Sequence, residues 1–335
     1  MSTPCPTINL FVLDAPRDGG AASAIAHWFE ALKVTNHRPR LLFLPPPEKA
    51  TGSRPSLLGV NGREISDGEA LELAHGPNLN IILAISPKHP SLPDLSPLSM
   101  LVLRSEADLA AITAAGKLRA AFPAVCTSPL LHAKVLSLGL PAVYLPLPFS
   151  APRATSEAQR NHHAIGLSRL SAKNNIGDII LANESVRPHQ RCLVFGSAGD
   201  AVHQIMADNP RFPTFYRGPM PATSRASGIS AARQAALVVY SNRNPGGMRY
   251  AMLEAIAAGA VLVAPSTALS QAGIIAGEEA FSYETPADLA AILAAPVGNR
   301  TRMGNAAHRH LAAHSPRTFA AAFHALLETS AAHRR

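Results

Sequence analysis

Short apolar segments alternate with longer segments of helical apolar spacing through the first half of the chain. A brief continuous apolar run between turn residues is typical of a buried strand, and apolar residues three or four positions apart are typical of a helix. The predicted strands are 8–13, 40–44, 80–85, 100–103, 124–127 and 142–145, and the predicted helices are 21–32, 107–115 and 130–138. This alternation predicts a parallel sheet covered by helices on both faces.

The same alternation restarts after 146–160, a segment rich in Pro, Ser, Ala and Arg that is predicted to be a linker. The predicted strands are 163–167, 191–195, 214–216, 237–240 and 261–264, and the predicted helices are 175–183, 199–207, 230–234, 248–258, 287–294, 299–313 and 316–332. We therefore expect an α/β protein with two Rossmann-like doubly wound domains, 1–148 and 149–315, facing a cleft, and a terminal helix within 316–335. A ligand is expected in the cleft, at the C-terminal ends of both sheets.

The composition narrows the classes of ligand. The 335 residues carry a net charge of +8, but Lys and Arg are scattered with no run of five, which argues against nucleic acid as a partner. A diffuse positive charge suits anionic small molecules such as sugar nucleotides, or an anionic membrane surface.

The three cysteines share no metal-ligand or redox spacing, which fits a reducing compartment. The first residues lack a signal-peptide pattern, and the apolar runs 81–85 and 236–240 are too short to span a bilayer. We expect a cytoplasmic protein, and peripheral contact with the inner face of the membrane stays open.

The segment 241–265, SNRNPGGMRYAMLEAIAAGAVLVAP, carries the most chemical information. A predicted strand ends at Tyr240, and a polar loop leads to a predicted helix whose free N–H groups would form an anion site suited to a diphosphate. Gly246 and Gly247 would let a ligand approach the backbone near Met248. Glu254 falls within an otherwise apolar helix face, where it would either bind the vicinal hydroxyls of a ribose or lie on a solvent-exposed face.

These residues resemble the donor-binding segment of GT-B glycosyltransferases that have a "glycosyl transferases group 1" domain. LEAIAAGAVLVAP repeats that family's Glu-Ala-x-Ala-x-Gly helix and following strand. The resemblance extends over most of 163–330. It implies that 149–315 binds a nucleotide-sugar, most plausibly a UDP-sugar, that 1–148 binds the acceptor, and that the terminal helix crosses back to the first domain.

The same resemblance assigns residues upstream of that segment. IGLSRLSAKNN, 165–175, is similar to the family's strand and loop whose Arg and Lys hold the donor diphosphate, here Arg169 and Lys173. LVFGSAGD, 193–200, supplies the family's Gly as Gly196, and FYRGPMP, 215–221, matches the loop that lies against the base. Independently of the family, two cations after a strand can stabilise the charge that grows on a leaving diphosphate, or they can be ordinary surface cations.

Two positions depart from the family pattern. Gly246 stands where the large retaining family has a second Glu that contacts the sugar ring, and the spacing between Arg169 and Lys173 is one residue shorter than usual. The first departure leaves the stereochemical outcome open. It also supports an alternative function, in which the protein binds the nucleotide without turning it over.

In the N-terminal half, FVLDAPRDGGAAS, 11–23, resembles the family's first strand and Gly-rich loop, in which Gly19 and Gly20 would approach the donor and acceptor. Asp18 is the candidate general base, with Asp14 and His89 as alternatives, although an Asp at this position is more often a cap of the next helix. The loop is not a GxGxxG fingerprint, which weighs against a nicotinamide or flavin site.

The expected function is therefore transfer of a sugar from a nucleotide-sugar to a hydroxyl of a glycan or lipid-linked acceptor of the cell envelope. No Asp-x-Asp motif and no zinc-type His spacing occur, so we expect neither a cofactor nor a metal ion. The alternatives are a non-catalytic scaffold of the same fold and another double-Rossmann enzyme such as a sugar-nucleotide epimerase. Oligomeric state is not indicated by the sequence.

Overall fold

The chain forms two compact units. One is the N-terminal unit, Met1–Ser150 with Ala313–Arg335, and the other is the C-terminal unit, Ala151–Ala312. The computed structural model describes residues 7–13, 19–45, 56–57, 60–84, 92–95, 98–104, 108–110, 113, 123–151, 161–167, 174–196, 201–218, 227–243, 246–296 and 300–332. In these ranges no helix is both long and apolar enough to cross a membrane.

The N-terminal unit is built on a seven-stranded parallel sheet. Its strands run in the order β5 (Arg63–Glu64), β2 (Arg38–Leu44), β1 (Thr7–Leu13), β6 (Leu79–Ala84), β7 (Met100–Leu103), β8 (Ala124–Cys126) and β9 (Ala142–Tyr144). A small antiparallel pair, β3 (Ser56–Leu57) and β4 (Val60–Asn61), accompanies it. The order reverses between β1 and β6, the kind of position where α/β sheets bind ligands.

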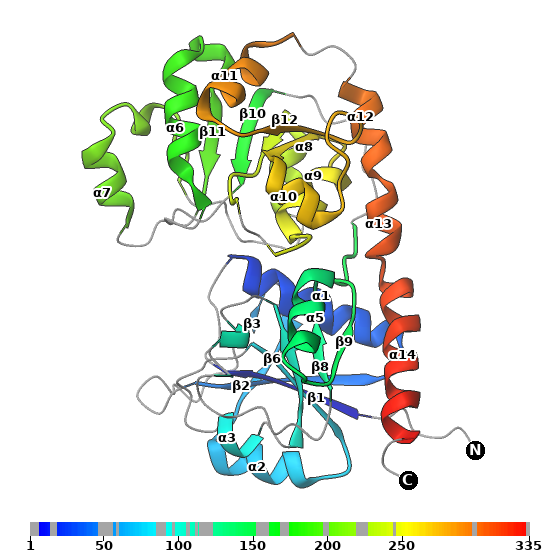
Figure 1. The fold of residues 1–335 in the computed structure, drawn as a ribbon. Helices are drawn as coiled ribbons and strands as arrows, with labels where there is room; N and C mark the ends of the chain where they lie inside the picture. Colours follow the sequence, from blue (N-terminus) through cyan, green and yellow to red (C-terminus); the bar gives the residue numbers. More distant parts are fainter. Residues whose placement is uncertain are drawn as a thin grey trace. The chain divides into compact units, whose positions relative to one another are not determined.

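Helices cover both faces of this sheet. On one face, α1 (Gly19–Val34) and α14 (Pro316–Ala332) share an apolar core in which Trp28 packs edge-on against Phe319, with ring centroids 4.9 Å apart. On the other face lie α2 (Asp67–His75), α3 (Leu92–Leu95) and α5 (Pro129–Ser137). Figure 1 shows α2 and α3 on the side of the sheet opposite α1. The apolar positions of 8–13 and 100–103 serve both faces, as the continuous apolar pattern predicts.

The C-terminal unit has a five-stranded parallel sheet with the order β11 (Cys192–Phe195), β10 (His162–Leu167), β12 (Ala235–Val239), β13 (Val261–Pro265) and β14 (Ala280–Tyr283). One apolar core joins it to α6 (Ile176–Ser185) and α11 (Pro286–Ala294). Two further helices, α8 (Ser227–Arg233) and α9 (Tyr250–Ala257), pack on β12 and β13 (Figure 1). The remaining helices are α7 (Ala201–Asp208), α10 (Ser266–Ala272), α12 (Arg300–Ala307) and α13 (Arg309–Ala313), with short 3-10 turns at Pro188–Gln190 and Phe212–Thr214. Two parallel sheets in two α/β units confirm the predicted fold class.

The predicted strand 214–216 was wrong. A 3-10 turn occupies Phe212–Thr214, and only Tyr216 forms an isolated parallel bridge with Val194. The Phe212 ring packs edge-on against Phe215 at 5.3 Å and stacks on Tyr216 at 5.1 Å. Aromatic side chains raise strand propensity in the sequence, but here they fill one end of the core from a tight turn.

The helix predicted over 299–313 is two helices, α12 and α13, separated at His308. The His308 ring Nε2 lies 3.1 Å from the carbonyl oxygen of Ile256, which holds the break against the end of α9. A close approach accompanies it: a Cβ on Gly304 of α12 would lie 3.3 Å from the carbonyl oxygen of Gly259. The prediction 107–115 falls mostly outside the described residues, and only 108–110 and 113 are seen as helical.

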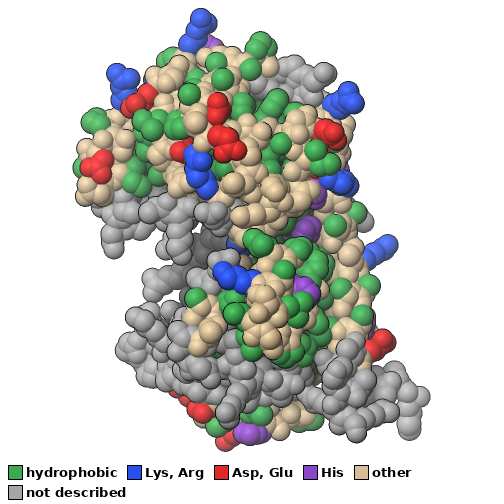
Figure 2. Space-filling model, viewed as in Figure 1, with side chains coloured by type: hydrophobic (Ala, Val, Ile, Leu, Met, Phe, Trp, Pro, Cys, Tyr) green, Lys and Arg blue, Asp and Glu red, His purple; other side chains and the backbone are tan. Residues whose placement is uncertain are grey.

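Charged side chains are interspersed on the face shown in Figure 2, where Lys and Arg of the described residues alternate with Asp and Glu. The net charge of +8 is therefore not gathered into one positive patch among the described residues of this face.

Candidate functional site

The strand order of the C-terminal unit marks one position for a ligand. β10 is followed in the chain by β11 on one side and then by β12 on the other, so the order reverses between β10 and β12. Ligands of open α/β sheets bind outside the carboxyl ends of the strands at such a reversal. These two strands end at Leu167 and Val239. The loops that follow them contain the donor-binding residues predicted from the sequence.

Side chains join these two loops to each other. The Ser241 hydroxyl, which is buried, donates to the carbonyl oxygen of Asn174, and the Asn242 side-chain amide lies 3.4 Å from the Asn174 side-chain oxygen. Asn175, next in the chain, is the N-cap of α6 and has a left-handed backbone with φ of 43°. The entry to α6 and the loop after β12 therefore form one hydrogen-bonded edge.

Arg243 fixes the same loop from a second direction. Its guanidinium donates to the Asp178 carboxylate at 2.9 Å and to the carbonyl oxygen of Glu284 at 2.8 Å. Asp178 lies in the first turn of α6, where an acidic side chain also suits the helix dipole. Because Arg243 is committed to these two acceptors, it holds the loop in place and is not a free cation for a ligand.

The helix predicted to begin at Met248 begins two residues later, at Tyr250. Gly246 and Gly247 have φ of 71° and 130°, and Arg249 is extended. Two successive positive φ angles turn the chain before it can enter the helix, and only glycine adopts them without strain. The loop is therefore longer than the sequence predicts, and Met248 belongs to it.

The N–H groups of Gly247 and Met248 point to anion binding. Both residues are buried, and neither N–H donates to any other group of the described residues. Buried N–H groups without acceptors are costly, and negatively charged oxygens at a helix start satisfy them. The Gly246 N–H differs, because it donates to the Gln271 side-chain oxygen at 2.8 Å.

Glu254 lies one turn into α9, on the helix face that carries Ala251 and Ala258. Within the described part of the chain no cation or hydrogen-bond donor contacts its carboxylate. Burial raises the pKa of Glu254 to about 7. An unpaired carboxylate in an apolar surrounding favours a ligand that brings its own hydroxyl donors.

Gly196 follows β11 at the same edge of the sheet and is buried. Its N–H donates to the carbonyl oxygen of Gly218 at 3.1 Å, and its own carbonyl oxygen accepts from the Tyr216 hydroxyl at 3.0 Å. Both backbone polar groups are used inside the unit. The Gly196 N–H is therefore not available as a donor to a ligand.

Three predicted residues, Asp18, Arg169 and Lys173, lie outside the described residues, as do Asp14 and His89. Gly19 and Gly20 are the first two residues of α1, which follows β1 of the N-terminal unit. The structure places Gly246, Gly247 and Met248 in the loop before α9 and Glu254 in the helix itself, and the roles of all the predicted site residues stay predictions.

A charged cluster that the sequence did not reveal ties α13 to the segment before β14. The buried Glu279 accepts from the Ile275 N–H at 2.8 Å and pairs with Arg309 and with His310, the His310 ring Nε2 lying 3.2 Å away. Burial alone would raise the pKa of Glu279, but the hydrogen bonds from Arg309, Ile275 and His310 outweigh burial and lower it to about 2. Among the described residues, no group of three His, Cys, Asp or Glu side chains could hold a metal ion.

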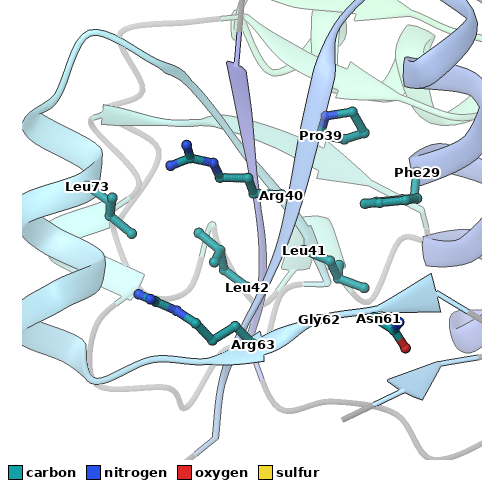
Figure 3. Close-up of a pocket in the computed structure, with 9 residues that line it drawn as sticks. All are labelled: Phe29, Pro39, Arg40, Leu41, Leu42, Asn61, Gly62, Arg63 and Leu73. Atoms are coloured by element: carbon teal, nitrogen blue, oxygen red, sulfur yellow. The ribbon is translucent and has the colours of Figure 1, made fainter. Parts of the chain in front are cut away.

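The N-terminal unit has a cavity of about 330 Å³ beside the outer edge of β2. Figure 3 shows Arg40, Leu42 and Leu73 on one side of β2 and Phe29 and Leu41 on the other, as strand alternation requires. The cavity lies along the first half of β2 and not at the carboxyl edge of the sheet, where the order reverses. It is therefore separate from the carboxyl edge of the sheet.

Gly62, which lines this cavity, lies close to the ring of Phe43, and Gly62→Ala tests how tightly the two pack. A Cβ there would lie 2.2 Å from Cε2 of the buried Phe43 ring. The ring must shift within a packed core, so we expect a loss of about 1–3 kcal/mol in the free energy of unfolding. Chemical denaturation measures it, and Gly68→Ala, at a glycine with nothing within 4 Å of the added Cβ, is the control. Equal stability of the two variants would contradict the packing described here.

Comparison with known proteins places the chain among glycosyltransferase folds. Residues 180–325 match the family model described as "Glycosyl transferase-like". The structure of HepE from Anabaena in complex with UDP and glucose is similar at a TM-score of 0.74 and 15% identity, with 96% of this chain and 99% of that chain covered. The pneumococcal O-GlcNAc transferase GtfA in complex with UDP and GlcNAc has a TM-score of 0.70 and 11% identity, with 97% and 99% covered. A search of curated protein sequences finds no match. Residues 180–325 are therefore similar to a glycosyltransferase-like family model, and the chain as a whole has the GT-B fold of two Rossmann-like units.

Proposed function

We propose that this protein is an enzyme that transfers a sugar from a UDP-sugar to a hydroxyl group of an acceptor. The observation that carries the proposal is the loop before α9 together with the helix itself. The N–H groups of Gly247 and Met248 in the loop and the carboxylate of Glu254 in α9 all lack a partner among the described residues. A nucleoside diphosphate offers anionic oxygens followed by vicinal ribose hydroxyls, and so complements both features. HepE has been crystallised with UDP and with UDP-glucose, which supports the choice of base.

The residues divide the chemical work as follows. The Gly247 and Met248 N–H groups receive the diphosphate, with Arg169 and Lys173 supplying positive charge, and Glu254 accepts hydrogen bonds from the ribose. The acceptor oxygen forms a bond to the anomeric carbon as the bond from that carbon to the diphosphate oxygen breaks. UDP leaves with the electron pair, and the acceptor proton passes to a base, for which Asp18 is the candidate. Donors aimed at the charge that grows on the leaving diphosphate are the main source of catalysis.

The acceptor is a glycan or lipid-linked hydroxyl compound in this proposal, bound by the N-terminal unit at the carboxyl ends of β1 and β6. Gly19 and Gly20 are the first two residues of α1, which follows β1, and glycine permits close approach of a ligand to the backbone. No metal ion takes part, because the diphosphate charge is balanced by N–H groups and cations. The assignment of the acceptor to the cell envelope rests on family resemblance alone.

One observation favours a second candidate, a protein that binds the nucleotide without transferring the sugar. Gly246 occupies the position where the large retaining family has its ring-contacting Glu, and its N–H is already bound to Gln271. Such a protein would bind UDP and leave a UDP-sugar intact. An epimerase would convert the sugar without releasing UDP.

A thermal-shift screen tests the donor site. UDP at about 100 times its dissociation constant should stabilise the protein by about 2.7 kcal/mol, a rise of several degrees in Tm, and GDP, ADP, TDP and CMP should give less. Product analysis with UDP-sugars and a mixture of glycan acceptors then separates transfer from epimerisation and from binding alone. If no nucleoside diphosphate raises Tm, the proposed donor site is wrong.

A further inference from the structure

α10, the short helix that directly follows β13, contacts the donor-site loop through two side chains. The Thr267 hydroxyl donates to the carbonyl oxygen of Arg243 at 2.8 Å, and the Gln271 side-chain oxygen accepts from the Gly246 N–H at 2.8 Å. Residues four apart lie on the same face of a helix. One face of α10 therefore grips the loop at two points, Arg243 and Gly246.

The grip determines which N–H groups remain for a ligand. Gly246 is the first of the two glycines with positive φ, and its peptide group is fixed by the bond to Gln271. The next two N–H groups, of Gly247 and Met248, have no acceptor among the described residues. The Gln271 side chain must present its oxygen to Gly246, because a backbone N–H can only donate. This requirement determines the orientation of the Gln271 amide.

The other side of α10 anchors this grip in the core. Ala268 and Leu269 are buried, and the helix ends at Gly273, whose left-handed backbone closes it with bonds back to Leu269 and Ser270. The Arg243 side chain is itself held by Asp178 and Glu284 on the opposite side of the loop. The loop is thus held by α6 on one side and by α10 on the other. Because α10 is anchored in the core, its bond from Gln271 restrains the Gly246 peptide.

We propose that Gln271, assisted by Thr267, is a positioning residue for the donor: it fixes the Gly246 peptide so that the Gly247 and Met248 N–H groups are aimed at the diphosphate before the ligand arrives. The identity of the ligand rests on the proposed function. The positioning of the loop rests on the two hydrogen bonds from α10, made by Thr267 and Gln271. A preordered site avoids the loss of affinity that follows when only a fraction of molecules has the competent loop.

Gln271→Met is the informative variant, because it keeps the length of the side chain and removes the acceptor. Thr267→Val removes the second contact, and Thr267→Ser retains it. Ser270→Ala changes an exposed position of the same helix whose side chain makes no bond within the described residues, and serves as the control. Gln271→Glu keeps an acceptor for Gly246 while placing a negative charge near the anion site.

Amide hydrogen exchange without ligand and UDP affinity are measured on each variant. Gln271→Met should speed exchange at Gly246 about tenfold and weaken UDP binding about 3- to 10-fold, with KM for the UDP-sugar raised and kcat less affected. Thr267→Val should have a smaller effect of the same kind, while Thr267→Ser and Ser270→Ala should match the wild type. Gln271→Glu should retain slow exchange at Gly246 but bind UDP more weakly.

Unchanged Gly246 exchange in Gln271→Met would overturn the grip, and faster exchange with wild-type UDP affinity would overturn its role in positioning the donor. The two arms also separate this inference from the proposed function. If wild-type protein binds no nucleoside diphosphate while exchange responds as expected, the grip is real and the donor assignment fails, and with it the positioning role.

Discussion

Glu254→Gln should make the C-terminal unit more stable above neutral pH while weakening nucleotide binding. In the folded protein burial raises the pKa of Glu254 from 4.5 to about 7. Between these two pH values the folded state therefore holds a proton that the unfolded state has lost. Stability of the wild type therefore falls as pH rises from 4.5 to 7 and stays reduced above 7. At 1.36 kcal/mol per pKa unit, and allowing for partial exposure of the side chain, the reduction is about 2–3 kcal/mol.

Gln cannot ionise, so the variant escapes this penalty. We expect its Tm to exceed that of the wild type by about 5–10 °C at pH 8 and to equal it near pH 4.5. Glu184→Gln, which neutralises an exposed carboxylate of α6, is the control and should show no such pH-dependent gain. A Tm for Glu254→Gln that stays equal to the wild type from pH 4.5 to pH 8 would show that Glu254 is paired in solution.

The opposite effect is expected for Glu279→Gln. Its carboxylate is buried and bound to Arg309, His310 and the Ile275 N–H, and these bonds lower its pKa from 4.5 to about 2. A lowered folded-state pKa contributes stability above pH 4.5 that is lost as pH falls through about 2. The contribution is about 3 kcal/mol, and removing one partner of a buried charged cluster costs a similar amount.

Denaturant titrations at several pH values measure this effect. Glu279→Gln should be about 3 kcal/mol less stable than the wild type at pH 7, and the difference should shrink steadily below pH 4.5. Glu278→Gln, at the exposed neighbouring position, should stay within about 0.5 kcal/mol. A deficit in Glu279→Gln that is the same at pH 3 and pH 7 would mean that the hydrogen bonds, and not the charge, stabilise the α13 contact.

The alternation of strands and helices was readable from the sequence because each buried strand is a continuous apolar run. The predicted strand 163–167 is β10, and 261–264 is β13, each within one residue. β14 was missed because AFSY is short and mixes polar with apolar residues. α10 was missed because it follows Pro265 of β13 without any turn residue between strand and helix. Local pattern carries no signal when two elements join directly.

The site was readable only where its residues are close in sequence. Gly246, Gly247, Met248 and Glu254 share one segment, so the order of loop, helix and carboxylate indicated them together. The contacts that hold this segment come from positions 25 and 65 residues away, at Gln271 and Asp178. Nothing about a single Gln in a helix distinguishes it from a surface residue, so only the folded chain identifies it.

Calorimetric titration of UDP-glucose at pH 7, in two buffers of different ionisation enthalpy, tests the central claim that α9 binds a nucleotide-sugar through Glu254. Ribose hydroxyls that donate to the carboxylate favour its charged form, so binding must release the proton that Glu254 holds. With a pKa of about 7, roughly half a proton should be released per bound ligand. Glu254→Gln should bind at least tenfold more weakly and release none, and Glu184→Gln should match the wild type. Wild-type affinity and proton release in Glu254→Gln would contradict the assignment of the ribose to Glu254, and no binding to wild type would contradict the donor site itself.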